Sequence, residues 1–254
     1  MLVLIAPAKR MRAEVDFFQA KDKPMYLEKT KVILDYLKQL KMKEMQLLLK
    51  CNDKIASDSY LNIQRFDFSK RGVPALFAYD GIQYQYIAPS IMEGGQLDYL
   101  QHHLRILSAF YGVLKPFDEV LPYRLELDDF LEDGLNLKEF WKEDWLEACD
   151  DEVILDLTSK QYGRQIHRYN RQKHIVTCRF KEAEGNHLVE KGVFVKMARG
   201  RMVRYLAGHQ IQKIEDVKEF SDLGFCYQSE LSSEHEYVFT RQNGNSRKKQ
   251  ALSL

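Results

Sequence analysis

A run of basic residues in the second half of the chain suggests chemistry with anions. Lys196, Arg199, Arg201 and Arg204 all lie within one nine-residue stretch. We expect this stretch to join a strand to a helix, so that free backbone N–H groups at the start of the helix add to the charge of Lys196 and Arg199. Such an arrangement binds phosphate or carboxylate groups. The alternative is a basic helix face exposed to solvent, without a ligand.

A second stretch, residues 121–126, places different chemical groups close together after a proline. Tyr123, Arg124 and Glu126 supply a phenol, a guanidinium and a carboxylate within four residues. These groups suit the wall of a binding cleft. The other interpretation is structural, with Arg124 paired to Glu126 and Tyr123 packed inside the protein.

The charges of the 254-residue chain are separated along the sequence, although the formal net charge is only +1. Residues 1–73 carry 15 basic and 9 acidic side chains, residues 116–156 carry 3 and 15, and residues 157–213 carry 13 and 3. If the basic segments meet in the folded protein, they form a face suited to a polyanion such as nucleic acid. If the acidic segment packs against the basic one that follows it, the charges cancel instead.

Several common kinds of site are absent from the sequence. It has no glycine-rich phosphate loop, no paired-histidine metalloprotease motif and no nucleophile elbow. The cysteines are widely spaced, which is typical of free thiols in a reducing compartment; they are Cys51, Cys149, Cys178 and Cys226. We therefore expect no metal and no cofactor. Because no apolar run approaches about 20 residues, we also expect a cytoplasmic protein without a membrane partner.

Hydrophobic periodicity and turn residues predict the elements that position these groups. Helices are predicted over residues 24–50, 54–63, 97–114, 137–149, 201–212 and 214–220. Strands are predicted over residues 1–6, 73–79, 153–157, 174–180, 189–195 and 236–241. This irregular alternation predicts a single compact α+β domain over residues 1–241, with a mixed β-sheet flanked by helices. A basic, flexible tail is predicted over residues 242–254.

Ordered motifs along almost the whole chain resemble those of the YaaA-type family of bacterial proteins. The most specific runs from residue 104 to residue 126 and ends in Pro-Tyr-Arg-Leu-Glu. Lys196-x-Ala198-Arg199-Gly200 matches the family's Lys-x-Ala-Arg-Gly element. The other matching segments are residues 1–9, 52–56, 140–141, 155–162, 224–225 and 238–241.

Some positions depart from the family pattern. Ala6 stands where the family has serine, and Asp156 stands where it has asparagine. Asp80 stands where the family usually has lysine, which reverses a charge beside the expected groove. We therefore expect Asp80 to weaken ligand binding by this chain.

The resemblance implies a family-specific fold with a positively charged cleft, and DNA binding through a helix-hairpin-helix-like element. It also implies a role in the response to hydroperoxide, in which oxidative damage is limited by keeping intracellular free iron low. Residues 40–63 are the first candidate for the DNA-binding element and residues 201–219 the second. Neither segment has the glycine pattern of that motif.

Two hypotheses follow, and the sequence identifies no protein partner for either. In the preferred one the protein is not an enzyme, and it binds duplex or branched DNA with little sequence specificity through phosphate contacts. The residues assigned to this contact are Lys9, Lys54, Arg105, Tyr123, Arg124, Lys196, Arg199 and Arg204. In the second, it is an enzyme acting on a small anionic or nucleotide substrate, with reactive groups on Lys196, Tyr123 and Ser108. Convergence on one deep pocket favours the enzyme, and spread along an open groove favours DNA binding.

Overall fold

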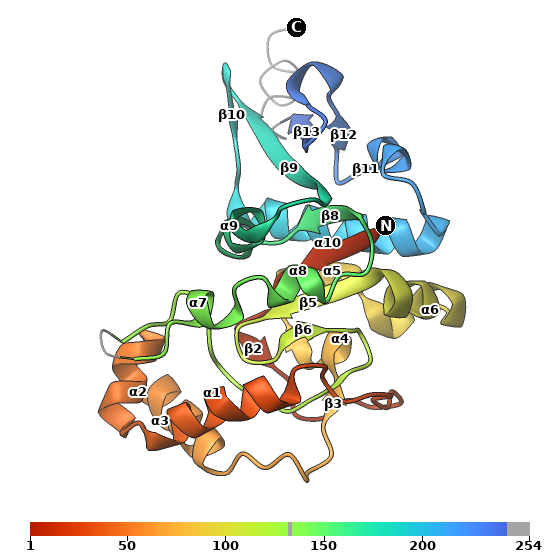
Figure 1. Ribbon diagram of the computed structural model, residues 1–254. Helices are drawn as coiled ribbons and strands as arrows, with labels where there is room; N and C mark the ends of the chain where they lie inside the picture. Colours follow the sequence, from red (N-terminus) through yellow and green to blue (C-terminus); the bar gives the residue numbers. More distant parts are fainter. Residues whose placement is uncertain (132–133, 243–254) are drawn as a thin grey trace, which may run out of the picture.

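A β-sheet with parallel central strands organises the protein (Figure 1). The computed structural model describes residues 1–131 and 134–242. Within them the sheet has nine strands in the order β11-β12-β13-β9-β8-β1-β5-β6, with β10 paired to β9. Neighbouring strands from β13 to β5 run parallel, and the remaining pairs are antiparallel. The strands of this sheet are β1 (Leu2–Ile5), β5 (Leu104–Ser108), β6 (Gly112–Leu114), β8 (Val153–Leu157), β9 (His174–Glu184), β10 (His187–Val189), β11 (Ser221–Asp222), β12 (Phe225–Tyr227) and β13 (Glu236–Gln242).

The helices lie around this sheet and below it. In Figure 1, α1, α2 and α3 gather at the end of the molecule opposite β9 and β13, and α10 packs on α5 and α6. The α-helices are α1 (Leu27–Gln39), α2 (Met42–Leu49), α3 (Asp53–Gln64), α4 (Ala75–Ala78), α5 (Ile82–Ile87), α6 (Gly94–His103), α7 (Leu137–Trp141), α8 (Asp144–Glu147), α9 (Lys160–Tyr169) and α10 (Gly192–His209). Short 3-10 turns are η1 (Pro89–Ile91), η2 (Glu215–Glu219) and η3 (Ser229–Leu231). No helix in the described part of the chain is both long and apolar enough to cross a membrane.

The predicted mixed sheet flanked by helices is confirmed, as a single compact α/β domain. The parallel centre of the sheet makes α/β the better description than the predicted α+β. Two short pairs lie outside the main sheet: β2 (Arg10–Met11) with β4 (Tyr79–Asp80), and β3 (Val73–Pro74) with β7 (Glu119–Val120). The tail predicted at 242–254 lies outside the described residues after Gln242.

The prediction of one helix over 97–114 is wrong. Helix α6 ends at His103, and the chain continues as β5, a central strand that pairs with β1. All five residues of β5 are buried, because helices or other layers cover both faces of a central parallel strand. Such a strand loses the alternation of polar and apolar residues, so its apolar residues imitate the spacing of a helix.

The predicted strand over 189–195 is also wrong beyond its first residue. Strand β10 ends at Val189, and α10 begins at Gly192. Val193 and Val195, whose β-branched side chains favoured a strand, lie in the first turns of this helix. The whole of 196–204 is therefore inside α10, and the predicted strand-to-helix junction with free N–H groups at Lys196 does not exist.

Other boundaries differ in smaller ways. The helix predicted over 24–50 is divided into α1 and α2 at Leu40, and the strand predicted over 73–79 is divided by α4. The helix predicted over 137–149 is divided at Lys142, and the helix predicted over 214–220 is the 3-10 turn η2, Glu215–Glu219. The strands predicted over 1–6, 153–157 and 236–241 and the helix over 54–63 are confirmed within a residue or two.

Candidate functional site

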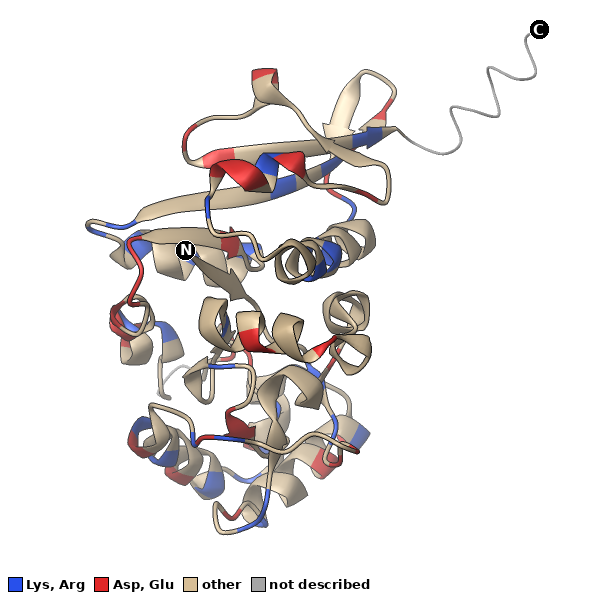
Figure 2. Cartoon of the chain, turned by 90° about the vertical axis from the view of Figure 1, so that its right-hand side faces the viewer, with Lys and Arg blue, Asp and Glu red and all other residues tan. Residues whose placement is uncertain are grey.

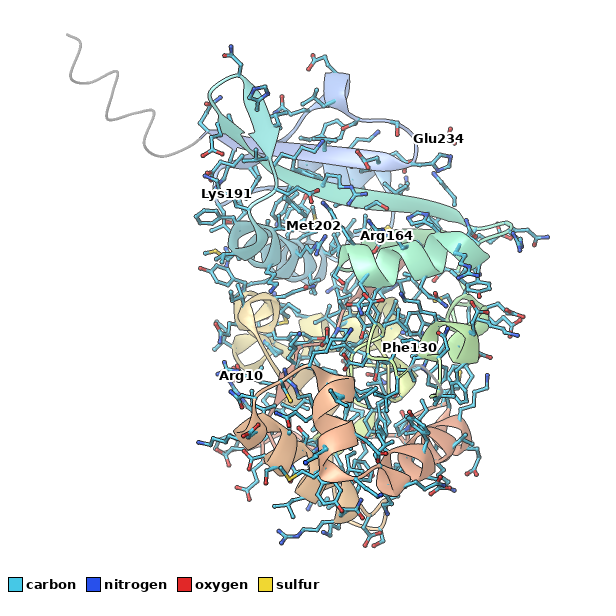
Figure 3. All side chains as sticks on the ribbon, turned by 90° about the vertical axis from the view of Figure 1, so that its left-hand side faces the viewer. Arg10, Phe130, Arg164, Lys191, Met202 and Glu234 are labelled. Atoms are coloured by element: carbon cyan, nitrogen blue, oxygen red, sulfur yellow. The ribbon has the colours of Figure 1, made fainter. Side chains whose placement is uncertain are left out.

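Two adjoining cavities form a cleft between the sheet and the lower helices. The inner cavity has a volume of about 440 Å³ and is lined by residues 6–10, 80–85, Glu126, Ser159, Gln161, Tyr162, Lys196 and Arg199. The outer cavity has a volume of about 370 Å³ and is lined by residues 9–11, 58–59, 62–63, Asp80 and 122–124. Lys9, Arg10 and Asp80 line both cavities and so mark the boundary between them. In Figure 3, Arg10 lies below the helices that carry Met202 and Arg164, which are α10 and α9.

The topology of the sheet explains why the inner cavity lies where it does. Strands β1 and β8 are parallel neighbours, so their carboxyl ends meet at one edge. The chain after β1 leads away toward β5 on one side, whereas β8 leads through α9 to β9 on the other. Connections that leave adjacent parallel strands in opposite directions open a crevice, which is the usual ligand position in α/β folds.

Helix α10 carries Lys196 and Arg199 into this crevice because it lies very close to α5. A Cβ atom added at Gly200 would lie only 2.3 Å from the backbone oxygen of Gln83 and 2.7 Å from Cβ of Tyr86. Only glycine permits that approach. The glycine of the Lys-x-Ala-Arg-Gly motif therefore builds the wall of the cavity, while its lysine and arginine face the space.

Arg199 is the most unusual side chain of the inner cavity. It is only 8% exposed, and its Nε has no hydrogen-bond acceptor in the described part of the protein. Burial lowers the pKa of Arg199, and the negative charges of Asp156 and Glu190 oppose that effect in part. Lys196, one turn earlier on the helix, is exposed at the mouth of the cavity.

The first turn of α9 forms another wall of the inner cavity. Ser159 is the N-cap residue, and its side chain makes no capping hydrogen bond. The first backbone N–H groups of any helix have no acceptor within the helix, and they carry partial positive charge. Ser159, Gln161 and Tyr162 all line the cavity, so this polar end of α9 faces the same space as Arg199.

Carboxylates neutralise several cations in and beside the cleft. Asp80 lies 3.1 Å from Arg10 and 3.6 Å from Arg12, and Glu126 lies 3.9 Å from Lys9. Burial raises the pKa of Glu126, and the positive charge of Lys9 opposes that effect. The departure at Asp80 noted in the sequence therefore acts on the basic residues of the cleft. Figure 2 shows a comparable mixture of acidic and basic residues over the lower helices.

Tyr123 and Ser108 form a buried network beneath the cleft. The hydroxyl groups of Ser108 and Tyr123 lie 2.7 Å apart, and that of Tyr79 lies 2.9 Å from Tyr123. Ser108 also accepts hydrogen bonds from the backbone N–H groups of Phe110 and Tyr111. Burial raises the pKa of Tyr123 well above its ordinary value, and that of Tyr79 to about 12. The two hydroxyls are thus neutral and hydrogen-bonded, and Lys196 lines a different cavity from Tyr123.

The remaining predicted residues take separate positions. Arg105 is 7% exposed and donates hydrogen bonds to the backbone oxygens of His102 and Leu104 at the end of α6, so it does not line the cleft. Arg204 is half-buried on α10 and lines neither cavity. Lys54 is exposed in the first turn of α3, one turn before Asp58 in the outer cavity. Within residues 1–131 and 134–242, no group of three His, Cys, Asp or Glu side chains is placed to hold a metal ion.

Comparison with known proteins assigns the family. The sequence model of the family described as "Peroxide stress protein YaaA" matches residues 1–231. This chain belongs to the YaaA family of peroxide stress proteins. Over 246 residues it is 43% identical to a UPF0246 protein of Agathobacter rectalis and 44% identical to one of Desulfitobacterium hafniense. Each alignment covers 95% of this chain and at least 98% of the relative.

Several lining residues of this YaaA-family protein, Arg10 among them, were missed among the site residues predicted from sequence, and three others add polar groups to the inner cavity. They are Gln83 on α5, and Ser159 and Tyr162 at the start of α9. Ser159 and Tyr162 lie in a segment that carries the family resemblance, and a serine shortly after a buried strand is a common helix start. Gln83 lies in a short helix of mixed composition, and no signal in the sequence separates it from its neighbours.

Proposed function

We propose that this protein acts in the peroxide stress response by binding DNA through the cleft and the start of α3. The observation that carries this proposal is the meeting of basic residues from distant parts of the sequence at the cleft. Lys9 and Arg10 follow β1, Arg124 follows β7, and Lys196 lies on α10. Cations placed in this way contact successive phosphates of a nucleic acid strand.

Helices α2 and α3 add support, because they have the arrangement expected of a helix-hairpin-helix element. They contact each other and are joined by the three residues from Lys50 to Asn52. Lys50 adopts the left-handed conformation, with φ 46°, at a position where such turns usually have glycine. Lys54 then lies at the start of α3, whose later residues line the outer cavity. The second candidate for the DNA-binding element, residues 201–219, contains the end of α10 and a 3-10 turn. It therefore does not have two α-helices joined by a short turn.

DNA binding is tested by fluorescence anisotropy with labelled duplex and branched DNA across a salt series. We expect binding that weakens steeply with salt. Lys196→Ala should flatten the log–log salt slope by about one unit, because one phosphate contact is lost. Lys213→Ala is the matched control, since Lys213 is exposed beyond the far end of α10 and lines neither cavity. An unchanged slope in Lys196→Ala contradicts the role of Lys196, and no binding at low salt contradicts the proposal.

We also propose that DNA binding is linked to low intracellular free iron. Cells that lack the protein and are challenged with hydrogen peroxide provide the test. Restoring the wild-type chain should lower the free iron measured by electron paramagnetic resonance, and restoring a variant without DNA affinity should not. If both lower it equally, the iron effect does not pass through DNA.

A second candidate function is an enzyme acting on a small anionic or nucleotide substrate. One specific observation favours it: Lys9, Lys196 and Arg199 converge on a single inner cavity. The buried positions of Ser108 and Tyr123 count against them as the reactive groups, because each hydroxyl is already engaged inside the protein. Turnover of nucleotides by the purified protein, lost in Lys196→Ala, is the measurement that supports this alternative.

A further inference from the structure

Three buried hydrogen-bond donors that line the inner cavity have no acceptor among the residues that the structure describes. They are Nε of Arg199, Nε2 of Gln83 and the hydroxyl of Tyr162. Their side chains belong to residues that are 8%, 7% and 2% exposed. Buried polar groups in folded proteins almost always have partners, so unpaired ones mark the place of a missing ligand or water. Three donors from α5, α9 and α10 facing one space call for an acceptor-rich group.

The start of α9 supplies further donors to the same space. The backbone N–H groups of its first turn have no intrahelical acceptor, and the Ser159 side chain does not cap them. Helix α9 has ten residues, and its N-terminus carries the partial positive charge of the helix dipole. An anion at this position satisfies both the helix end and the unpaired side chains.

The carboxylates closest to Arg199 are already engaged by other groups. Asp156 accepts a hydrogen bond from the backbone N–H of Thr158 at 2.8 Å and lies 3.7 Å from His167. Glu190 is paired with Lys160 at 2.9 Å and lies 3.9 Å from Arg179. Arg199 and Lys196 are therefore left to face the cavity, and the two lining carboxylates, Asp80 and Glu126, are paired with other cations.

The volume of the cavity limits the size of the ligand. At about 440 Å³ it lies within the range of roughly 300–1,000 Å³ that holds a small organic molecule, and it is much larger than one phosphate group. Ala6, Pro7 and Ile82 add apolar surface to the lining of the cavity. The cavity therefore suits a ligand with one phosphate at the α9 end and an organic part beside these residues.

We propose that the inner cavity binds the phosphate monoester group of a nucleotide-sized ligand, held by Arg199, Lys196, Gln83 and the first turn of α9. A free nucleotide and the 5′-phosphate end of a DNA strand share this chemistry. The inference does not depend on binding along the DNA backbone, which uses internal phosphodiesters. It supplies a ligand class for the small-substrate alternative.

Isothermal titration calorimetry with adenosine 5′-monophosphate, adenosine and inorganic phosphate tests the inference. We expect binding of the monophosphate, weaker binding of phosphate alone, and none of adenosine. Lys196→Ala should lower the affinity for the monophosphate at least about tenfold, because a charge-assisted contact is lost. Lys213→Ala should leave this affinity unchanged. Binding of adenosine equal to the monophosphate, or no binding of either phosphate, overturns the inference.

Arg199→Met separates a ligand-binding arginine from a structural one. Methionine fills a similar volume and needs no acceptor, so we expect a folded variant that has lost monophosphate binding, with at most a modest fall in thermal midpoint because Asp156 loses a nearby cation. A lower midpoint with retained binding shows that Arg199 is structural and contradicts its assignment. If Arg199→Met fails to fold, Gln83→Leu tests the same cavity by removing a single side-chain donor group. Unchanged monophosphate affinity in Gln83→Leu contradicts the contact assigned to Gln83.

Oligonucleotides distinguish the two sources of the phosphate. A duplex with 5′-phosphate ends that binds more tightly than the same duplex with 5′-hydroxyl ends identifies a strand end as a ligand of the cavity. Monophosphate binding with no difference between the duplexes identifies a free nucleotide. If both duplexes bind equally and the monophosphate does not bind, the proposed DNA binding is supported and only the inference about the inner cavity is overturned.

Discussion

The inner cavity and the pairing of β9 with β13 both contain buried charged groups, but these groups differ in whether they have partners. On β9, Glu182 is 3% exposed and accepts hydrogen bonds from Lys191, at 2.7 Å, and from Arg241 on β13. In the inner cavity, Nε of Arg199 and two other donors find no acceptor within residues 1–131 and 134–242. Burying a charge is costly unless it is paired. The paired cluster stabilises the sheet, whereas the unpaired one holds its donors ready for a ligand.

The close contact of α10 with α5, which creates the cavity wall, gives the largest expected effect. Gly200→Ala places a Cβ atom 2.3 Å from a backbone oxygen, and the resulting overpacking outweighs the gain of about 1 kcal/mol from better helix propensity. We expect a net loss of about 2 kcal/mol in the free energy of unfolding, measured by urea denaturation. Gly208→Ala on the same helix is the control, because its nearest neighbour is 3.6 Å away. It should gain stability, and a similar loss in both variants contradicts the steric argument.

Removing the charge of Glu182 tests the paired side of the comparison. Burial by itself raises the pKa of Glu182, but the bonds from Lys191 and Arg241 hold it below its usual value. Glu182→Gln should therefore lower the free energy of unfolding by about 2 kcal/mol, since two charge-assisted hydrogen bonds weaken, while DNA and monophosphate affinities stay the same. Glu184→Gln, which is exposed, should change stability by less than about 0.5 kcal/mol. Equal effects of the two variants contradict a stabilising role of the buried Glu182 pairing.

Asp118 extends the comparison to a buried carboxylate that is held by a backbone hydrogen bond, and the charges of Lys115 and Arg105 offset its burial only in part. It is 3% exposed and accepts a hydrogen bond from the backbone N–H of Lys115, and burial raises its pKa to about 6. Between about pH 4 and pH 6 the folded protein keeps a proton that the unfolded chain releases, so stability falls as pH rises through this window. The Asp118→Asn variant has no carboxyl group at this position and so does not lose stability in this way. The difference in unfolding free energy between the variant and the wild type should therefore shift by about 2 kcal/mol in favour of the variant from pH 4 to pH 7. Parallel stability curves from urea titrations contradict this pKa.

The smallest expected effect concerns the boundary between the two cavities, where Asp80 neutralises cations. Asp80→Asn frees Arg10 and Arg12 from their carboxylate partner. We expect DNA affinity at low salt to rise by roughly threefold to tenfold, with a salt slope steeper by about one unit. Asp98→Asn is the matched control, because Asp98 is exposed on α6 and lines neither cavity. The same gain in both variants indicates a general change of net charge instead of a local one.

The sequence by itself determined the family and much of the secondary structure. The short apolar runs that became β1 and β8 are bounded by Pro7 and by polar residues, and local patterns of this kind do not depend on distant contacts. The Lys-x-Ala-Arg-Gly motif likewise singled out Lys196 and Arg199, which both line the inner cavity. Charge, spacing and resemblance were sufficient for these assignments.

Only the tertiary structure decided which of the predicted residues meet. Arg105 and Arg199 are both arginines in motifs that carry the resemblance, yet Arg105 donates to the end of α6, whereas Arg199 faces a cavity and its Nε has no acceptor in the described part of the chain. That difference depends on the pairing of β1 with β5 and β8, and on the contact of α10 with α5 at Gly200. Contacts between residues about 100 positions apart leave no periodic trace in the sequence. The apolar run of β5 was read as a helix for the same reason, because its burial on both faces comes from neighbours that the local pattern does not contain.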